Sequence, residues 1–360
     1  MKRTLKIRKF TCFKIFFFVS LLFGDSLFSE AACVGTECAS LPAEVVIGSN
    51  LIDPALDAVY TKEFLLSMGE AAVLQNINSS MLGGTIFTKR RIGAGYSIAR
   101  TNLSPRNYFF ENSELRELPK QGMAASPSVN FGFNLGSLFE GPSPQLSKWN
   151  IHFHYFPYEL SEQNVPFLKL RKTDLHGKVA NTGFNVRYFP FYSSANSSDG
   201  IGKDGLSLGF GIFQSIQTIS LHSYDRKPTN IRLSGQPRKW IGINDLTYNS
   251  NIYSATFDFR YAKTIGFFSF YGGLGGMFNQ GSVGIQVERN FALSALANKD
   301  DFTTNPTLVY LDLKRNLFVN HSNWYGTIGM EFNWKDASVI IEYLKNKNSE
   351  SVSLGVFIHF

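Results

Sequence analysis

The end of the chain alternates between apolar and small or polar side chains. In residues 350–360 every second position is apolar, and the positions between are mostly serine, glycine and histidine. Successive side chains of a strand point to opposite faces, so this alternation predicts a strand with one continuously apolar face. The apolar set is Val352, Leu354, Val356, Ile358 and Phe360. Because the same period of two recurs along most of the chain, we expect an all-β fold.

The chain ends on Phe360, an aromatic ring beside a carboxylate, which suits a membrane interface. In this pattern the segment resembles the final strand of bacterial outer-membrane β-barrels, which has apolar residues at every second position and ends in Phe. The resemblance implies that this strand closes a transmembrane antiparallel barrel, and that its apolar residues are the signal read by the barrel assembly machinery. Outer-membrane lipid and lipopolysaccharide are then the expected surroundings.

Period-two segments continue from Met81 to the end of the chain. Twelve of these segments make the main set of predicted strands. Two further candidate strands, at 166–171 and 230–234, would raise the count to fourteen. Either count is even, as a barrel with both ends in the periplasm requires. Such a barrel is wider than an eight-stranded one and has room for a pore, a ligand or a plug. The main set is twelve strands, at 81–89, 92–100, 127–139, 147–158, 177–192, 205–222, 247–263, 267–278, 281–291, 322–334, 336–345 and 350–360.

The connections between these strands differ in length. Short turns at 279–280 and 334–336 are expected on the periplasmic side, and the longer segments 192–205 and 292–321 on the extracellular side. Aromatic residues near strand ends are expected to form two interfacial girdles. Members of these girdles are Tyr188, Phe189, Phe191, Trp324 and Trp334. Three connections, at 101–126, 159–176 and 223–246, are long although the strand list assigns them to the periplasmic side.

Residues 1–31 have the pattern of an export signal. Six basic residues precede an apolar run at 15–23, which is too short to span a bilayer. The expected cut follows Ala31, with a cut after Ala32 as the alternative. The whole chain has 35 basic and 28 acidic residues; without the leader the balance is 29 minus 26, or +3. The basic charge belongs mostly to the leader, so no nucleic-acid partner is expected.

Helical spacing appears once, at 53–77, within an N-terminal segment at 32–80 that precedes the barrel at 81–360. Asp53 is a good N-cap and Pro54 suits the first helical position. Apolar residues at every fourth position predict an amphipathic helix; they are Leu56, Tyr60, Phe64, Met68 and Ala72. The helix could fill the lumen as a plug, lie across the periplasmic mouth or cap the sheet edge.

Two cysteines remain after the predicted cut. Cys33 and Cys38 are close in sequence, in a compartment where disulfides persist, so a small local disulfide loop is the default. Acylation of Cys33 is the alternative, and Glu30 three positions upstream argues against it. No pair of His or Cys accompanies them, so we expect neither a metal site nor a cofactor.

A channel or substrate-specific transporter for small or hydrophobic solutes is the first function that this architecture favours. The plan of a helix followed by strands is similar to transporters of the long-chain fatty-acid type. The Asn-Pro-Ala signature of that family is absent, because residues 53–55 read Asp-Pro-Ala. Polar residues inside apolar strands would face the lumen and contact a solute. The candidates are His152, His154, Asp258 and Arg260.

The alternative is a surface-exposed adhesin or structural protein. It would bind host surface molecules or envelope components through extracellular loops at 193–204 and 292–321. An enzyme is not expected, because none of the 6 histidines lies in a recognisable nucleophile or acid-pair motif.

Overall fold

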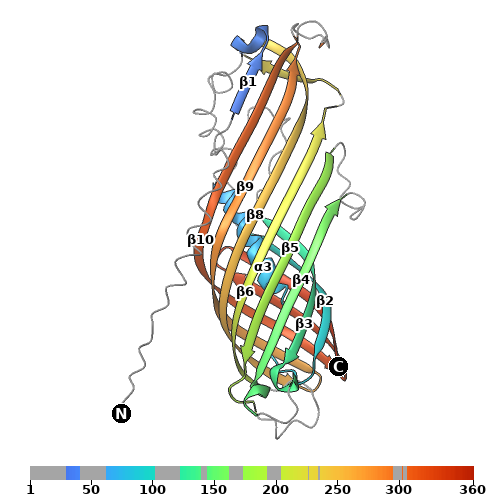
Figure 1. Ribbon diagram of the computed structural model, residues 1–360, viewed down its shortest axis with the longest axis vertical. Helices are drawn as coiled ribbons and strands as arrows, with labels where there is room; N and C mark the ends of the chain where they lie inside the picture. The colour runs from blue at the N-terminus through green and yellow to red at the C-terminus, as the bar shows by residue number, and fades with distance from the viewer. Residues whose placement is uncertain are drawn as a thin grey trace, which may run out of the picture.

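The strands of the chain form one antiparallel sheet that closes on itself (Figure 1). The computed structural model describes residues 30–40, 62–101, 122–138, 144–161, 173–192, 204–225, 227–233, 236–294, 302 and 306–360. Ten strands make the ring, which closes where β12 pairs with β2. In order they are β2 (Arg91–Thr101), β3 (Met123–Asn134), β4 (Trp149–Ser161), β5 (Thr173–Tyr188), β6 (Gly205–Tyr224), β8 (Gln236–Ile265), β9 (Phe268–Leu293), β10 (Thr307–Trp334), β11 (Ala337–Asn346) and β12 (Ser349–His359).

An apolar belt surrounds the lower part of this barrel. On β10 the outward residues between Trp324 and Trp334 are apolar or glycine, and both tryptophans are exposed. Ten residues at about 3.3 Å each, on a strand tilted by about 40°, span roughly 25 Å, the height of the lipid-facing band of a transmembrane barrel. The alternating residues of β12, including Val352 and Ile358, are exposed on the same outer surface. The prediction of an all-β transmembrane barrel in the outer membrane is confirmed.

The C-terminus and the two-residue turns at 266–267 and 335–336 lie at the lower end in Figure 1. Outer-membrane barrels have short turns on the periplasmic side, so this end is periplasmic. The turn at 335–336 agrees with the prediction. At this end, but outside the belt, a hydrogen bond from Lys89 lowers the pKa of Asp336 below its ordinary value.

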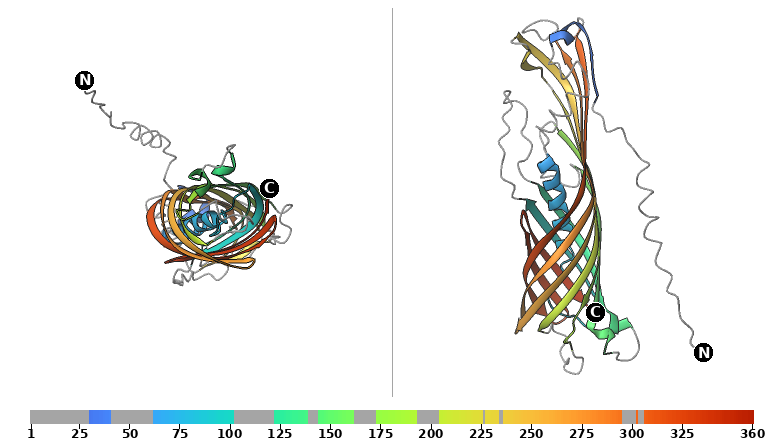
Figure 2. Two further views of the ribbon diagram at one scale, coloured as in Figure 1. Left: turned by 90° about the horizontal axis from the view of Figure 1, so that it is seen from below. Right: turned by 90° about the vertical axis from the view of Figure 1, so that its left-hand side faces the viewer.

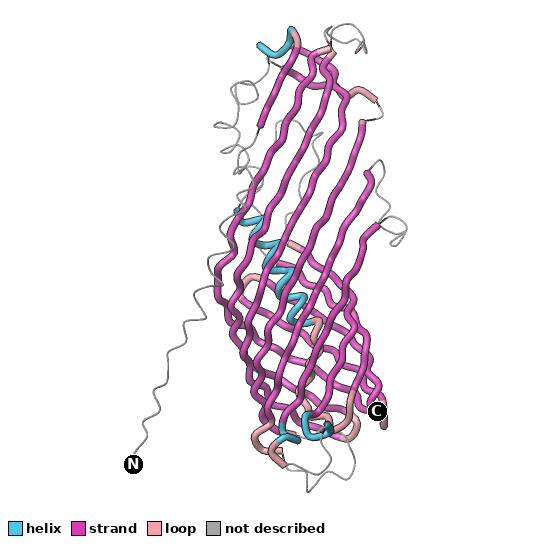
Figure 3. The backbone as a smooth tube through the Cα atoms, viewed as in Figure 1, coloured by secondary structure: helices cyan, strands magenta, loops and turns pink. Residues whose placement is uncertain are grey.

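Three strands continue far above the belt. β8, β9 and β10 have 30, 26 and 28 residues, whereas about 9–11 suffice to cross a bilayer. Figure 3 shows them as continuous strands from the lower end to the top of the molecule. We call the part above the belt the extension. It consists of residues 214–224, 236–251, 279–293 and 307–322, together with β1 (Glu30–Val34) and β7 (Thr229–Leu233).

The N-terminal strand β1 is attached near the top of the extension. It pairs with β10, with Glu30 opposite Asp312 and Val34 opposite Leu308. A short 3-10 helix, η2 (Thr36–Ser40), follows, and a disulfide joins Cys33 to Cys38. The predicted cut after Ala31 stays a prediction, and it would leave Ala32 to Val34 of this strand in place.

The α-helix α3 (Lys62–Asn78) lies inside the ring (Figure 2, left). It is a plug in the lumen rather than a cap on the mouth or on a sheet edge. Residues 53–61 of the predicted helix lie outside the described residues. The remaining turns are not amphipathic in the expected way, because both apolar Leu74 and polar Gln75 are fully buried. A helix enclosed by a barrel has no solvent-facing side, so its polar residues must find partners in the wall.

The predicted strand count is close, although several boundaries are wrong. Residues 81–89 form no strand. The predicted strands 267–278 and 281–291 are one strand, β9, and the expected turn at 279–280 is paired along its length, with Asn279 opposite His321. The expected loop at 292–321 is strand from Thr307 onward. The candidate strand at 230–234 corresponds to β7, while 166–171 lies outside the described residues.

The expected position of one loop is also wrong. We had expected the connection after β5 to be extracellular, but β5 ends and β6 begins at the lower, periplasmic end of the barrel. The strands on either side of 101–126, 159–176 and 223–246 meet these connections at their upper, extracellular ends, opposite to the side that the strand list gave them. The error arose because the strand list began with 81–89, which is not a strand. This extra strand assigned each connection before β9 to the wrong side of the membrane.

In the part of the chain that the structure describes, no helix is long and apolar enough to cross a membrane. Among the same residues, no group of three or more His, Cys, Asp or Glu side chains is arranged to hold a metal ion.

Candidate functional site

Small side chains make room for the plug on one side of the lumen. Inward positions of β12, β2 and β3 are mainly serine, glycine and alanine, and a side chain on Gly95 or Gly355 would collide with Met81. The small wall residues next to the helix include Ala99, Ala124, Ser97 and Ser351, all buried. The outward apolar residues of the closing strand face lipid, and the small residues between them determine the width of the lumen.

The polar side of α3 is held by hydrogen bonds to several strands. Asn76 donates to the carbonyl oxygen of Gln214 at 2.9 Å, and its own amide oxygen lies 2.8 Å from His154 Nε2. Asn78 donates to Ser351 Oγ at 2.9 Å. Since each of these contacts lies inside the lumen, the helix cannot shift without leaving buried polar groups without partners, which is costly.

A second set of amides holds the middle of the helix. The carboxylate of Glu70 accepts hydrogen bonds from Asn323 on β10 and Asn346 on β11, each at 2.9 Å. Gln75 accepts one from Asn181 on β5, also at 2.9 Å. The helix is thus tied to opposite sides of the ring.

The apolar side of α3 packs against the base of the extension. Its Leu65, Val73, Leu74 and Ile77 form one buried cluster with wall residues. Those residues are Phe213, Tyr248, Ile252, Met277, Val283, Ile285, Val319, Tyr325 and Leu344. The lumen is therefore occupied by packed side chains at the level of the helix, and the structure is that of a closed barrel.

Residues 81–85, which follow the helix, are clamped by three charged side chains of the wall. We call this segment the latch. Glu331 accepts a hydrogen bond from the Gly84 N–H at 2.6 Å and another from the Thr85 hydroxyl. Arg260 donates to the Gly83 carbonyl at 3.0 Å. Arg91 donates to the carbonyls of Met81 at 3.3 Å and Leu82 at 3.2 Å.

Four charged residues of the wall form a buried network below the helix. Asp258 accepts from Arg187 at 2.7 Å and from Arg260 at 3.4 Å. Arg260 lies 2.9 Å from Glu342. All four side chains are at most 2% exposed, so each charge depends on its partners for the stabilisation that water would otherwise give. Tyr325 and Tyr271 complete the network by donating to Asp258 and Glu342.

The four lumen residues that we predicted lie where expected, facing the interior. Asp258 and Arg260 meet in the buried network. His154 bonds the plug, and His152 Nδ1 lies 2.8 Å from a guanidinium nitrogen of Arg91. His152 and His154 are neighbours on one face, yet they serve two different contacts. The role of these residues in ligand binding stays a prediction, as does the assembly role of the five alternating apolar residues at 352–360.

The outer face of the extension is polar directly above the belt. On β9, Gln280, Ser282, Gln286 and Glu288 follow the last lipid-facing residue, Phe278. Across this face Gln286 donates to Glu288 and Asp312. A hydrogen bond from Lys314 to Asp312 raises the pKa of the lysine above its ordinary value. Such a ladder of polar pairs is expected of a sheet face in water.

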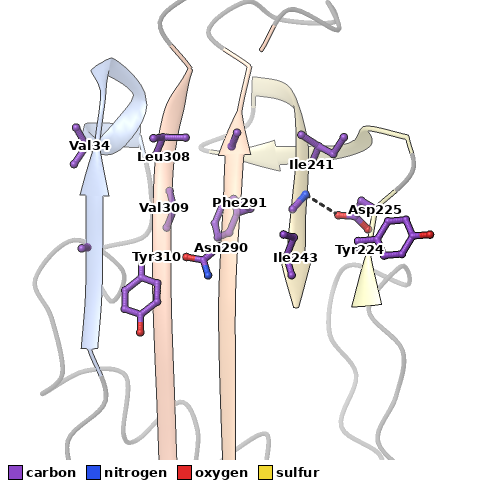
Figure 4. A pocket seen from close by; sticks show the side chains of 13 residues that line it. Val34, Tyr224, Asp225, Ile241, Ile243, Asn290, Phe291, Leu308, Val309 and Tyr310 are labelled. Atoms are coloured by element: carbon purple, nitrogen blue, oxygen red, sulfur yellow. Dashed lines mark hydrogen bonds between the residues drawn. The ribbon is translucent and has the colours of Figure 1, made fainter. Parts of the chain in front are cut away.

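Apolar residues return to this outer face at the top of the extension (Figure 4). A shallow open hollow of about 570 Å³ lies across β1, β10, β9, β8 and the end of β6. We call its apolar part the tip patch, defined by Val34, Ile241, Ile243, Leu308 and Tyr310. Val34 is 71% exposed and Leu308 55%, values that apolar residues of a soluble sheet rarely have together. At its edge, Asp225 accepts from the Gly242 N–H at 3.2 Å.

A model of one protein family, described as Lsa36-like, matches residues 26–360. The chain belongs to the Lsa36-like family. No curated protein matches the chain.

Among solved structures this Lsa36-like chain is similar to the CymD monoaromatic hydrocarbon channel, with 9% identity over 81% of this chain and 93% of that one, at a TM-score of 0.23. It is also similar to the Pseudomonas putida toluene transporter TodX, with 8% identity over 76% of this chain and 90% of that one, at a TM-score of 0.28. A third similar structure is Ail of Yersinia pestis, the attachment invasion locus protein, with 10% identity over 76% of this chain and 99% of that one, at a TM-score of 0.22. At these TM-scores the likenesses carry no argument about function.

Sequence reasoning missed the latch, the partners Arg187 and Glu342, and the tip patch. The two partners were visible as charged residues in predicted strands. The tip patch was hidden because its residues come from three strands, β1, β8 and β10, none of which we had predicted as strand at that height.

Proposed function

We propose that the chain is a surface-exposed binding protein of the outer membrane. The barrel is its anchor, and the extension presents the binding face to the outside. Support comes from one observation above all: β8, β9 and β10 continue for roughly 50 Å of strand above the apolar belt and end in an exposed apolar patch. This version of the alternative hypothesis assigns binding to a sheet face instead of to loops.

Two features support this function over passive passage. The lumen is filled at the level of α3 by buried side chains on both sides of the helix. A pore also has no need of a wall that is high on one side only. An apolar patch of this kind, at the point farthest from the membrane, is typical of a protein–protein contact.

The test compares two double variants on nanodisc-embedded protein. Ile243→Asp with Leu308→Asp places two charges in the tip patch. The matched control, Asn249→Asp with Ser282→Asp, places the same charges on the same outer face nearer the membrane. Binding to cultured epithelial cells is measured by flow cytometry. We expect the tip variant to lose most binding and the control to bind like the natural chain.

Two results would overturn the proposal. One is equal binding by the tip variant and the natural chain. The other is no binding by the natural chain to epithelial cells or to purified lipopolysaccharide.

A second function, substrate-specific passage of small solutes, is favoured by the composition of the lumen wall. The plug is joined to that wall by hydrogen bonds and packing, without any strand pairing, so it can in principle be displaced as a unit. Once it is displaced, the exposed wall is polar: Asn181, Asn185, Ser215 and Thr256 are among its buried residues. This function requires a signal that releases the plug, and conductance measurements distinguish it from the first.

A further inference from the structure

One edge of β10 has no described neighbour over part of its length. β11 ends with Asn346 opposite Tyr325, and β1 begins with Glu30 opposite Asp312. Between these two points β10 is paired with β9 on its other side. Within the described residues no strand pairs with the remaining side of residues 316–324, which we call the open edge. Figure 2 (right) shows the tall wall of the extension standing above the rest of the ring.

An open strand edge can bind another strand through its backbone groups. Its N–H and C=O groups point sideways and form a template for another strand. Proteins usually protect such edges with proline, lysine or other charged residues. The open edge reads Asn-Leu-Phe-Val-Asn-His-Ser-Asn-Trp and contains neither a proline nor a Lys, Arg, Asp or Glu residue. Lys314 and Arg315 lie directly before the open edge, so charge flanks its upper end while its nine residues carry none.

The strands at both ends of the open edge define its length and direction. β11 and β1 are both antiparallel to β10, so they run in the same direction, from the membrane toward the tip. A strand placed between them would continue that direction. Nine residues of strand span roughly 30 Å, so an extended peptide of about that length fits the interval.

The side chains of the open edge add a specific contact. Phe318 points outward and is 65% exposed, although it lies above the belt, among polar Asn316 and Asn320. Its neighbour on β9 is Ser282, which is too small to cover the ring. A residue on an added strand would lie beside Phe318, where aromatic and β-branched partners are favoured.

The partner is an extended peptide and not a second copy of the same chain. Every strand pair in the described sheet is antiparallel. Two copies inserted in one membrane have the same orientation, so their β10 strands would meet in parallel. A flexible segment of another protein has no such restriction and can approach in the required direction.

We infer that the open edge binds an extended segment of a partner protein, which adds to the sheet as a strand antiparallel to β10. The ligand class is a peptide of about nine residues without proline, with an aromatic or β-branched residue beside Phe318. This surface differs from the tip patch, and the inference does not depend on the proposed function.

The test starts from nonapeptides selected from a random display library against the full mature chain in nanodiscs. Hydrogen exchange of the chain is then measured with a selected peptide at about ten times its Kd. At that ratio the peptide occupies about nine-tenths of the sites, so exchange of protected amides in 316–324 slows about tenfold. Tip-patch variants are expected to show the same protection, which separates this inference from the proposed function.

Two versions of the peptide, N-methylated at odd or at even residues, test the strand geometry. Only alternate N–H groups of a strand point toward one neighbour, so one version loses binding and the other keeps it. Phe318→Ala weakens binding by about two- to fivefold, whereas the control Ile328→Ala, on the same strand within the belt, does not.

The inference is overturned by a selection without binders, by protection that lies outside the open edge, or by equal binding of both methylated peptides. Association of the nanodisc protein with itself through 316–324, seen as mutual protection without peptide, would also overturn it.

Discussion

The lower barrel and the extension are built from the same strands, yet their two faces are reversed in polarity. On β9 below the belt boundary, Phe270 and Phe278 point outward while Tyr271 and Asn279 point inward. Above it, Ser282 and Glu288 point outward while Val283 and Ile285 point inward. The alternation of period two continues unbroken; only the solvent outside the wall changes, from lipid to water.

The comparison shows what stabilises each region. The outer surface of the lower barrel contacts lipid, so its apolar side chains gain nothing by being buried in the interior. They stay outside, and the interior can hold polar and charged networks. The extension faces water and needs an apolar interior, which it shares with the helix. Three matched pairs of variants and one double variant test this difference, and they follow in order of the expected difference in stability between variant and control, from the largest to the smallest.

Removing Asp258 is expected to have the largest effect. Asp258→Ala leaves Arg187 and Arg260 buried without one of their counter-charges, at a cost of about 3–5 kcal/mol in unfolding free energy. The matched change in the extension, Asp312→Ala, removes a carboxylate whose partner Lys314 is 30% exposed and keeps contact with water, so it is expected to cost much less. Urea unfolding in lipid vesicles, followed by heat-modifiable gel mobility, measures both. Equal losses would show that the two regions are stabilised alike.

Arginine placed on the outer face of β9 tests the belt boundary. Leu274→Arg, near the middle of the belt, is expected to cost about 2–4 kcal/mol. Ser282→Arg, on the same face of the same strand above Phe278, is expected to be close to neutral. The same unfolding assay applies. A similar penalty at both positions would mean that the belt extends higher than the sequence pattern indicates.

The fit of the latch is tested by two glycines with positive φ. Gly83 has φ +71° and an added methyl would collide with Glu331, whereas Gly266 has φ +62° and open space around it. Both changes to alanine carry the cost of a left-handed backbone, about 1–2 kcal/mol. Gly83→Ala adds about 1–3 kcal/mol from overpacking. If the two variants are equally stable, the latch is not packed as described.

The smallest expected effect is that of the disulfide. Replacing Cys33 and Cys38 by serine releases β1, which pairs only with β10 among the described strands. We expect unchanged urea unfolding of the barrel, but faster hydrogen exchange in residues 307–312. A loss of global stability would show that β1 does more than cover the upper edge of β10.

Most of the barrel could be predicted from sequence because lipid imposes a strict alternation. β12, β4 and β5 were located within a few residues, since apolar residues such as Phe153 and Val356 alternate with small or polar ones. The upper strands could not be predicted, because the expected length came from the thickness of a bilayer. At Asn279 and Gln280 the outer face becomes polar, and that change looked like a turn.

The plug and latch were only partly predictable. Helical spacing located α3, but its buried polar residues bond to atoms up to 276 positions away, as in the contact of Asn346 with Glu70. The latch was included in the predicted strand 81–89, at the start of the period-two pattern, although its own residues do not alternate strictly. Its backbone groups bond to Glu331 and Arg260 instead of to a neighbouring strand. Such pairings depend on the tertiary structure, and local sequence does not encode them.

Single-channel conductance in a planar bilayer tests the central claim most directly, because that claim is a closed barrel that acts through its extension. The full mature chain is compared with a variant that lacks residues 62–78, each shown beforehand to have folded by its heat-modifiable mobility. We predict no conductance steps from the full chain and steady steps from the variant without the plug. Steady steps from the full chain would contradict the account and return the protein to the class of open channels.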